Sequence, residues 1–134
     1  MKIYYAAAML GDRSNFHNNK IIINELKKYG FTILTEFILG DIEVDVPPVE
    51  IYRRDINLLR ESDILIADIS YPSLGVGFEI AYALNLNKKV IALCRKDRIE
   101  NTSRLILGID DKNFQIITYE NPFKAIKKIL DLVF

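Results

Sequence analysis

The fold is decided by the stretch ILIADISYPSLGVGFE, residues 64–79. Its first four residues form a short, continuous apolar run, which is typical of a parallel strand buried on both faces. Pro72, Gly75 and Gly77 then bend the chain tightly, and an apolar helix is predicted over residues 76–86. A buried strand that turns sharply into a helix is the building unit of parallel α/β sheets. We therefore expect an α/β fold.

The same alternation of apolar runs and amphipathic stretches continues on both sides of this unit. Strands are predicted at residues 3–8, 31–34, 63–68, 89–94 and 114–119. Helices are predicted at residues 14–29, 49–62, 76–86, 102–107 and 122–134, and an acidic, irregular loop over residues 37–48. This order predicts a doubly wound, five-stranded parallel sheet between two helix layers, with the flavodoxin-like strand order 2-1-3-4-5. We expect residues 1–134 to form a single domain.

Composition and charge exclude several classes of protein. The 18 Lys and Arg balance 18 Asp and Glu, so no long-range field attracts a nucleic acid polymer or an anionic membrane. No apolar run approaches the ~20 residues of a membrane span, and the strand-like N-terminus does not resemble a signal peptide. Cys94 and His17 are the only residues of their kinds, which argues against an internal disulfide and a histidine-rich metal site; we interpret both as structural. We expect a cytoplasmic domain without metal or cofactor.

The loops that follow the strands are where a ligand should bind. In doubly wound sheets the site lies outside the carboxyl ends of the strands, here residues 7–13, 69–77 and 94–103. Gly75 and Gly77 open the helix after the third strand, where free N–H groups and the helix dipole suit an anion, and Ser73 adds a hydroxyl. This turn lacks the lysine of a P-loop and the third glycine of a dinucleotide fingerprint, so the pattern alone is weak evidence.

Glu79 is the sharpest candidate for chemistry. It is the only charged residue between Asp68 and Lys88, and its neighbours make the helix apolar nearly all round. We expect such a helix to be buried, and a buried carboxylate without a partner is costly. The functional interpretation is a carboxylate held in the ligand cleft. The alternative is a glutamate that faces water and complements the helix dipole.

Other candidates are ambiguous when taken alone. Asp55 is predicted early in a helix whose start faces the cleft, yet such a residue is ordinarily solvated and paired with an arginine. Tyr4 and Tyr5 alternate on the first strand, so one points to each face, and packing is the default role of both. Arg13 is ordinarily a surface residue, although it could bind a phosphate bidentately. Ser103 is ordinarily a helix cap.

A series of short motifs resembles a known family. They are Tyr4-Tyr5-Ala6-Ala7-Ala8 with Gly11 and Arg13, Leu34-Thr35-Glu36, Asp55, the string PSLGVGFE at residues 72–79, and Cys94-Arg95. Together they closely resemble the 2'-deoxynucleoside 5'-phosphate N-hydrolase family, which belongs to the nucleoside 2-deoxyribosyltransferase superfamily. The resemblance extends from Ile3 to Phe134, and the string at residues 72–79 is highly specific to the hydrolase branch.

The resemblance implies a role for each matching residue. Glu79 would attack C1' of the deoxyribose, Asp55 would protonate the departing base, and Tyr4 would hold Glu79 through its hydroxyl. The 5'-phosphate would be bound by Ser73 and by the N–H groups of Gly75 and Gly77.

Further residues would contact the substrate from the first loop and from the late helix. Met9 and Leu105 would lie near the base or sugar, and Gly11 and Arg13 belong to the substrate-binding first loop. Ser103 resembles a serine that relatives contribute to the phosphate site of the neighbouring subunit, which implies a homodimer with shared sites.

Some positions depart from the family pattern. Leu10 stands where relatives carry an arginine, and Ala7 and Ala8 replace a glycine and a serine. Phe37 replaces a histidine beside the base and could still stack on it. Arg13 or Arg104 would then supply the missing positive charge.

The leading hypothesis is an N-glycosidase that cleaves 2'-deoxynucleoside 5'-monophosphates into free base and 2-deoxyribose 5-phosphate. Cleavage passes through an oxocarbenium-like state, which one carboxylate stabilises or traps while a second group protonates the leaving nitrogen. One alternative is a nucleoside 2-deoxyribosyltransferase acting on unphosphorylated deoxynucleosides, where a second base replaces water. The others are a non-catalytic nucleotide-binding module and a flavodoxin-like electron carrier.

Overall fold

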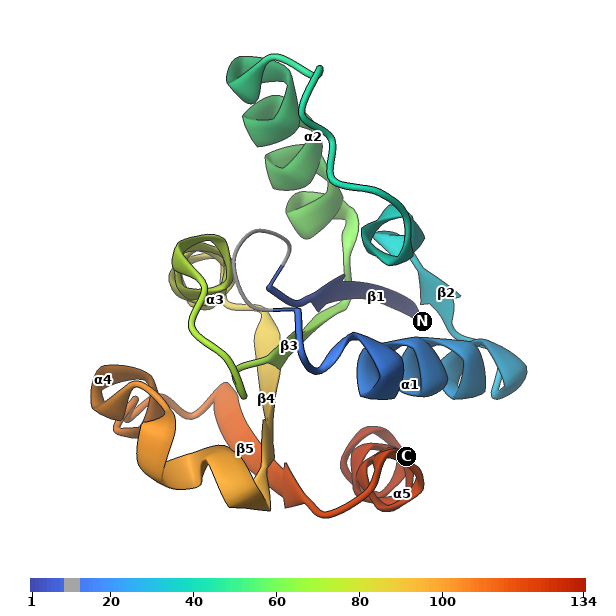
Figure 1. Ribbon diagram of the computed structural model, residues 1–134, viewed down its shortest axis with the longest axis vertical. Coiled ribbons are helices and arrows are strands. Elements are labelled where there is room, and N and C mark those ends of the chain that lie inside the picture. The colour runs from blue at the N-terminus through green and yellow to red at the C-terminus, as the bar shows by residue number, and fades with distance from the viewer. Residues whose placement is uncertain (9–12) are drawn as a thin grey trace.

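A five-stranded, all-parallel sheet runs through the middle of the molecule (Figure 1). The computed structural model describes residues 1–8 and 13–134, and the predictions for Met9, Leu10 and Gly11 lie outside these residues. The strands are β1 (Lys2–Ala6), β2 (Thr32–Ile33), β3 (Ile64–Asp68), β4 (Lys89–Arg95) and β5 (Phe114–Tyr119). Their order in the sheet is β2-β1-β3-β4-β5, which confirms the predicted topology.

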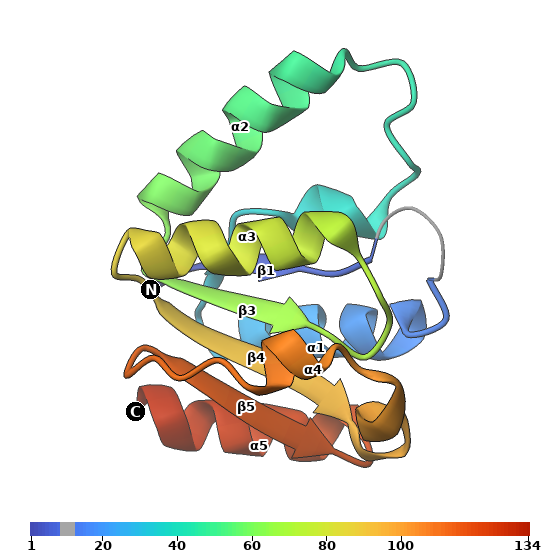
Figure 2. The ribbon, with the colours of Figure 1, turned by 90° about the vertical axis from the view of Figure 1, so that its left-hand side faces the viewer.

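Helices cover both faces of this sheet (Figures 1 and 2). They are α1 (Phe16–Lys28), α2 (Pro48–Glu61), α3 (Leu74–Asn85), α4 (Arg104–Leu107) and α5 (Pro122–Val133), with short 3-10 helices η1 (Glu36–Leu39) and η2 (Lys96–Asn101). Helices α1 and α5 pack together on one face, and α2 and α3 lie on the other. In the described residues no helix has the length and apolar character needed to cross a membrane.

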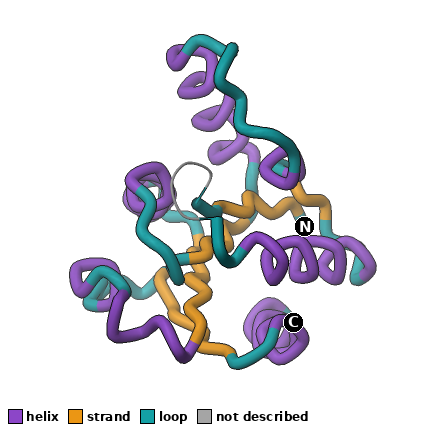
Figure 3. Tube along the Cα trace, viewed as in Figure 1, coloured by secondary structure: helices purple, strands orange, loops and turns teal. Residues whose placement is uncertain are grey.

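Alternation along the central strands divides the core between the two faces. Tyr5 packs with α1 and α5, whereas its neighbour Tyr4 packs with α2 and α3, as the sequence predicted. Strand β3 is buried along its whole length, because it pairs with β1 on one side and β4 on the other. Figure 3 shows that all the strands lie inside the helical layers, with loops gathered at the ends.

Helix α3 departs from the prediction that it is buried nearly all round. Only Val76, Ile80 and Ala83 are buried, whereas Leu74 is 97% exposed and Phe78 is 50% exposed. The reason is geometric, since a helix on a sheet presents one stripe to the strands, and α2 covers only part of the outer side of α3. The outer stripe of α3 is therefore both apolar and open to solvent.

The loops and short elements show smaller differences. The predicted loop over residues 37–48 begins with η1, in which Ile38 is buried, and only residues 40–47 are irregular. The second strand shortens to Thr32–Ile33, and the late helix shortens to Arg104–Leu107 after η2. Asp55 lies in the middle of α2 rather than early in the helix, since α2 begins at Pro48. Helix α1 ends before Gly30, whose φ of 91° suits glycine.

Candidate active site

Tyr4 and Glu79 meet on the face of the sheet that carries α2 and α3. Strand β1 places Tyr4 in the core, where its side chain is 2% exposed. Helix α3 places Glu79 above it, and the Tyr4 hydroxyl donates a hydrogen bond to Oε2 of Glu79. Glu79 is thus held by a partner in the protein. This contradicts the alternative of a glutamate that simply faces water.

The environment of Glu79 brings the pKa of its carboxyl group close to neutral pH. Burial raises the pKa of Glu79 from 4.5 to about 7, while the hydrogen bond from Tyr4 lowers this pKa and the charge of Asp55 raises it. Burial together with the carboxylates of Glu79 and Asp55 raises the pKa of Tyr4 well above its ordinary value. Tyr4 therefore stays protonated and donates its hydrogen bond to the carboxylate at every physiological pH.

Asp55 brings a second carboxyl group to the same place. Its charge acts on both Glu79 and Tyr4, so the three groups form one electrostatic cluster. Burial raises the pKa of Asp55 above its ordinary value, and the neighbouring Arg54 guanidinium opposes this rise. Nε of Arg54 donates to Oδ1 of Asp55 at 3.0 Å. A carboxyl group whose pKa is raised by burial is suited to donate a proton.

Ser73 and the glycines form the turn that leads into α3. Ser73 is the N-cap of the helix, and its Oγ accepts a hydrogen bond from N of Val76 at 3.3 Å. A Cβ added at Gly77 would meet no atom within 4 Å, so the first turn of α3 is open on that side. Beside it lies a hollow lined by residues of this turn, of α3 and of α4: Ile69, Tyr71, Pro72, Ser73, Val76, Gly77, Ile80 and Ile106.

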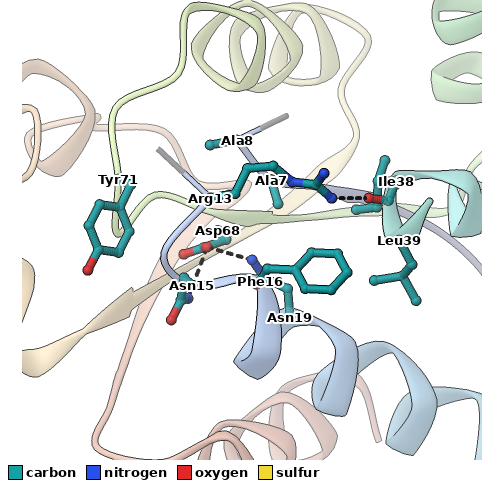
Figure 4. A pocket seen from close by; sticks show the side chains of 10 residues that line it. All are labelled: Ala7, Ala8, Arg13, Asn15, Phe16, Asn19, Ile38, Leu39, Asp68 and Tyr71. Carbon is teal, nitrogen blue, oxygen red and sulfur yellow. Dashed lines mark hydrogen bonds between the residues drawn. The ribbon is translucent and has the colours of Figure 1, made fainter. Parts of the chain in front are cut away.

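Arg13 does not join this hollow. Its Nη2 donates to the backbone oxygens of Ile38 at 3.1 Å and Gly40 at 3.4 Å, and its guanidinium lies over the Phe16 ring. Figure 4 shows Arg13 extending towards Ile38, while Tyr71 lies on the opposite side of a second hollow. Arg13 therefore joins the start of α1 to η1. In the described residues, Arg13 thus contacts Ile38, Gly40 and Phe16 rather than the turn that contains Ser73.

The residues predicted on the late helix lie at the surface. Ser103 is the N-cap of α4, accepting from N of Ile106 at 3.3 Å. Ser103 and Arg104 are exposed, and Leu105 is 82% exposed. Helix α4 reaches the hollow beside Ser73 through Ile106 only.

Phe37 has a neighbour that the sequence analysis missed. The Arg54 guanidinium lies over the Phe37 ring at 3.9 Å, and its Nη1 contacts both carboxylate oxygens of Glu43 at 2.9 and 2.7 Å. Arg54 and Glu43 are eleven residues apart and separated by an irregular loop. The only signal in the sequence was the position of Arg54 directly before Asp55.

A buried network around Asp68 was also missed. Oδ2 of Asp68 accepts from the side-chain amides of Asn15 at 3.0 Å and Asn19 at 2.9 Å, and Oδ1 accepts from N of Ser70. Asp68 ends β3, and the network joins it to the first turn of α1 (Figure 4). Its three donors satisfy a carboxylate that is 3% exposed. In the described residues, no group of three His, Cys, Asp or Glu is placed to hold a metal ion.

The arrangement of Glu79, Tyr4 and Asp55 is typical of one class of enzyme. A carboxylate of raised pKa, held by a tyrosine and paired with a second carboxyl group, matches the two-carboxylate chemistry of glycosidic bond cleavage. Both groups lie on helices that pack on one face of a parallel sheet.

Comparison with known proteins identifies the family. The family model of the nucleoside 2-deoxyribosyltransferases matches residues 3–116. A protein of Thermofilum pendens, provisionally named 2'-deoxynucleoside 5'-phosphate N-hydrolase 1, is 46% identical over 132 residues, 96% of this chain and 92% of that one. The 5-hydroxymethyl-dUMP N-hydrolase of Tetraodon nigroviridis is 33% identical over 83% of this chain and 82% of its own. A CMP N-glycosidase of Clostridium botulinum superposes over 100% of both chains, with a TM-score of 0.75 and 25% identity.

The chain therefore belongs to the nucleoside 2-deoxyribosyltransferase family. This confirms the resemblance found in the sequence. It is an enzyme of the class that acts on N-glycosyl compounds.

Proposed function

We propose that the protein hydrolyses the N-glycosidic bond of 2'-deoxynucleoside 5'-monophosphates, releasing the free base and 2-deoxyribose 5-phosphate. The observation that carries this proposal is the hydrogen bond from Tyr4 to Glu79, made beside Asp55. The names of the Thermofilum and Tetraodon relatives support a nucleotide substrate and hydrolysis.

In the first step, the Glu79 carboxylate attacks C1' of the deoxyribose. The bond between C1' and the base nitrogen breaks, its electron pair stays on the nitrogen, and Asp55 supplies the proton that neutralises the leaving base. Tyr4 orients the Glu79 carboxylate and lowers the pKa of Glu79, which increases the ionised fraction. In the second step, water attacks C1', Asp55 takes up the proton of that water, and Glu79 is released as a carboxylate.

The turn before α3 is our candidate for the 5'-phosphate site. The Ser73 hydroxyl and the Gly75 N–H stand at the positive end of a helix of twelve residues, whereas the Gly77 N–H already donates to the backbone oxygen of Ser73 at 3.2 Å. The chain has no net charge, so a phosphate must be held by such local groups rather than by a long-range field. Leu105 on the neighbouring α4 is our candidate for a contact with the sugar or base.

We also propose that the enzyme is a homodimer in which Ser103 contributes to the phosphate site of the partner. The outer stripe of α3 is apolar, with Leu74 97% exposed and Phe78 50% exposed beside the Tyr52 ring of α2. Leu105, 82% exposed on α4, is a third large apolar side chain, and its neighbour Ile106 lines the hollow of Ser73. Burying this surface against a second copy would remove it from water and bring α4 of one subunit near α3 of the other.

The proposal is tested by Glu79→Ala in an assay that separates free bases from the four common deoxynucleoside monophosphates. We expect base release to fall by at least 1000-fold. Glu25→Ala is the matched control, since Glu25 lies on α1 on the opposite face of the sheet and should leave turnover unchanged. Unchanged turnover by Glu79→Ala would remove Glu79 from the mechanism.

Two further measurements separate hydrolysis from related outcomes. Rapid quenching followed by intact-protein mass spectrometry should find 2-deoxyribose 5-phosphate bound to the wild type and not to Glu79→Ala. Addition of a second free base should leave the products unchanged for a hydrolase, whereas formation of a new nucleoside would identify a transferase. Binding of deoxynucleotides without any product would identify a non-catalytic module.

A further inference from the structure

The Arg54 guanidinium joins three segments of the chain on one side of the site. Its Nη1 contacts both carboxylate oxygens of Glu43, its Nε donates to Oδ1 of Asp55, and its Cζ lies 3.9 Å from the Phe37 ring centre. Glu43 belongs to the irregular loop before α2, Phe37 to η1, and Asp55 to α2 itself. One side chain thus connects α2 to both segments that precede it.

These contacts are better sheltered than the other ion pairs of the molecule. The side chains of Arg54, Glu43 and Asp55 are 32%, 30% and 25% exposed. In the rest of the described chain, every ion pair has at least one partner that is more than 45% exposed. One guanidinium nitrogen, Nη1, contacts both oxygens of Glu43 while Nε contacts Asp55, so the partly sheltered guanidinium is held at two of its nitrogens.

The arrangement leaves the two oxygens of Asp55 unequal. Oδ1 accepts the Nε hydrogen of Arg54, so the proton that leaves with the base must be carried by Oδ2. An arginine beside an acid also favours the ionised form of that acid, which opposes its function as a proton donor. Glu43 offsets this effect because its carboxylate occupies Nη1 and balances the positive charge.

We propose that Arg54 and Glu43 are positioning residues for the general acid: Arg54 holds Asp55 by one oxygen and joins it to Phe37, and Glu43 neutralises Arg54 so that Asp55 keeps its proton. This inference rests on the proposed function, in which Asp55 protonates the leaving base.

The charged and titratable groups that face Asp55 come from four elements. Arg54 lies on α2, Glu43 on the loop before it, Tyr4 on β1 and Glu79 on α3. Glu43 raises the pKa of Asp55 and Arg54 lowers it. Substitutions of the two residues should therefore shift the titration of Asp55 in opposite directions. A loss of local packing would not produce opposite shifts.

The experiment uses two substrates to isolate the proton of Asp55. One is a deoxynucleoside 5'-monophosphate, whose base needs a proton to leave. The other is 4-nitrophenyl 2-deoxyribofuranoside 5-phosphate, whose leaving group departs as an anion and needs none. Both substrates need ionised Glu79. Dividing kcat/KM for the deoxynucleotide by kcat/KM for the nitrophenyl substrate therefore cancels the effect of Glu79 ionisation. This ratio falls as the pH rises through the pKa of Asp55.

Three variants are compared with the wild type. Glu43→Gln should move the pH midpoint of this ratio about one pH unit lower. At pH values above the midpoint, the ratio should therefore be about tenfold smaller than in the wild type. Arg54→Gln should move the midpoint to higher pH and lower the plateau about tenfold, because Asp55 is no longer held. Glu36→Gln is the matched control. Glu36 is the residue before Phe37 and pairs with Lys27 at the surface, so the substitution removes a negative charge near Phe37 and should leave the ratio unchanged.

Each outcome decides the matter. Midpoints that stay at the wild-type pH in both variants overturn the inference, as do shifts in the same direction. Equal losses with both substrates also overturn it, since they indicate a structural role. The inference and the proposed function fail separately: an inactive wild type refutes the function, whereas an active wild type with unmoved midpoints refutes only the roles of Arg54 and Glu43.

Discussion

Replacing Glu79 with glutamine should stabilise the protein above neutral pH although it removes the catalytic carboxylate. Burial raises the pKa of Glu79 from 4.5 to about 7, so ionisation of this group disfavours the folded state. Glutamine has nearly the same shape and keeps an oxygen that can accept the hydrogen bond of Tyr4. The substitution therefore removes the charge and little else.

The magnitude follows from the difference between the pKa of 4.5 in the unfolded chain and the pKa of about 7 in the folded protein. At about 1.4 kcal/mol per unit, the wild type loses about 3 kcal/mol of folding free energy as Glu79 ionises. The sign follows from proton binding, because the folded state holds the proton more tightly. The contribution of proton binding by Glu79 to the free energy of unfolding is complete below pH 4.5, declines as the pH rises, and is lost above pH 7.

Urea unfolding of the wild type and Glu79→Gln from pH 4 to pH 9 measures this difference. The two free energies of unfolding should agree at pH 4 and diverge by about 3 kcal/mol at pH 8, with similar m-values. Glu25→Gln on the opposite face is the control and should show no such divergence. A difference that is constant across the pH range, or a variant less stable than the wild type at pH 8, would refute the reasoning.

Three further predictions follow from the same contacts. Tyr4→Phe should raise the pKa of Glu79 further and lower kcat/KM at pH 7 by about 10–100-fold. A pH–rate profile should show the difference in kcat/KM from the wild type narrowing above pH 9. An equal difference at every pH contradicts the role of Tyr4 in favouring ionised Glu79. Asp68→Ala should cost about 3 kcal/mol in urea unfolding because the buried donors Asn19 Nδ2 and Ser70 N lose their acceptor, whereas Asp97→Ala, 62% exposed, should cost less than about 1 kcal/mol. Ser73→Ala should cost about 1 kcal/mol as a lost helix cap and raise KM for deoxynucleotides but not for deoxynucleosides; equal KM changes would remove Ser73 from the phosphate site.

The predictions that succeeded concern residues whose neighbours in the sequence already determine their environment. Glu79 is the single charge in a long apolar stretch, so the sequence favoured a buried carboxylate with a partner over one that faces water. Tyr4 was found as that partner only through the family resemblance, because the strand pattern alone made packing its default role. The hydrogen bond between them links positions 75 residues apart. No local pattern indicates a contact over such a separation.

The amino-acid order was sufficient for the topology of this enzyme. Continuous apolar runs must be buried on both faces, and right-handed connections then leave few ways to arrange five parallel strands. The folded chain alone decided which charges meet. Arg13 binds the carbonyls of Ile38 and Gly40, and Arg54 binds Glu43, because the path of residues 36–47 brings those groups within reach. Ion pairs and exposed stripes depend on how distant segments pack, and packing is a property of the whole molecule.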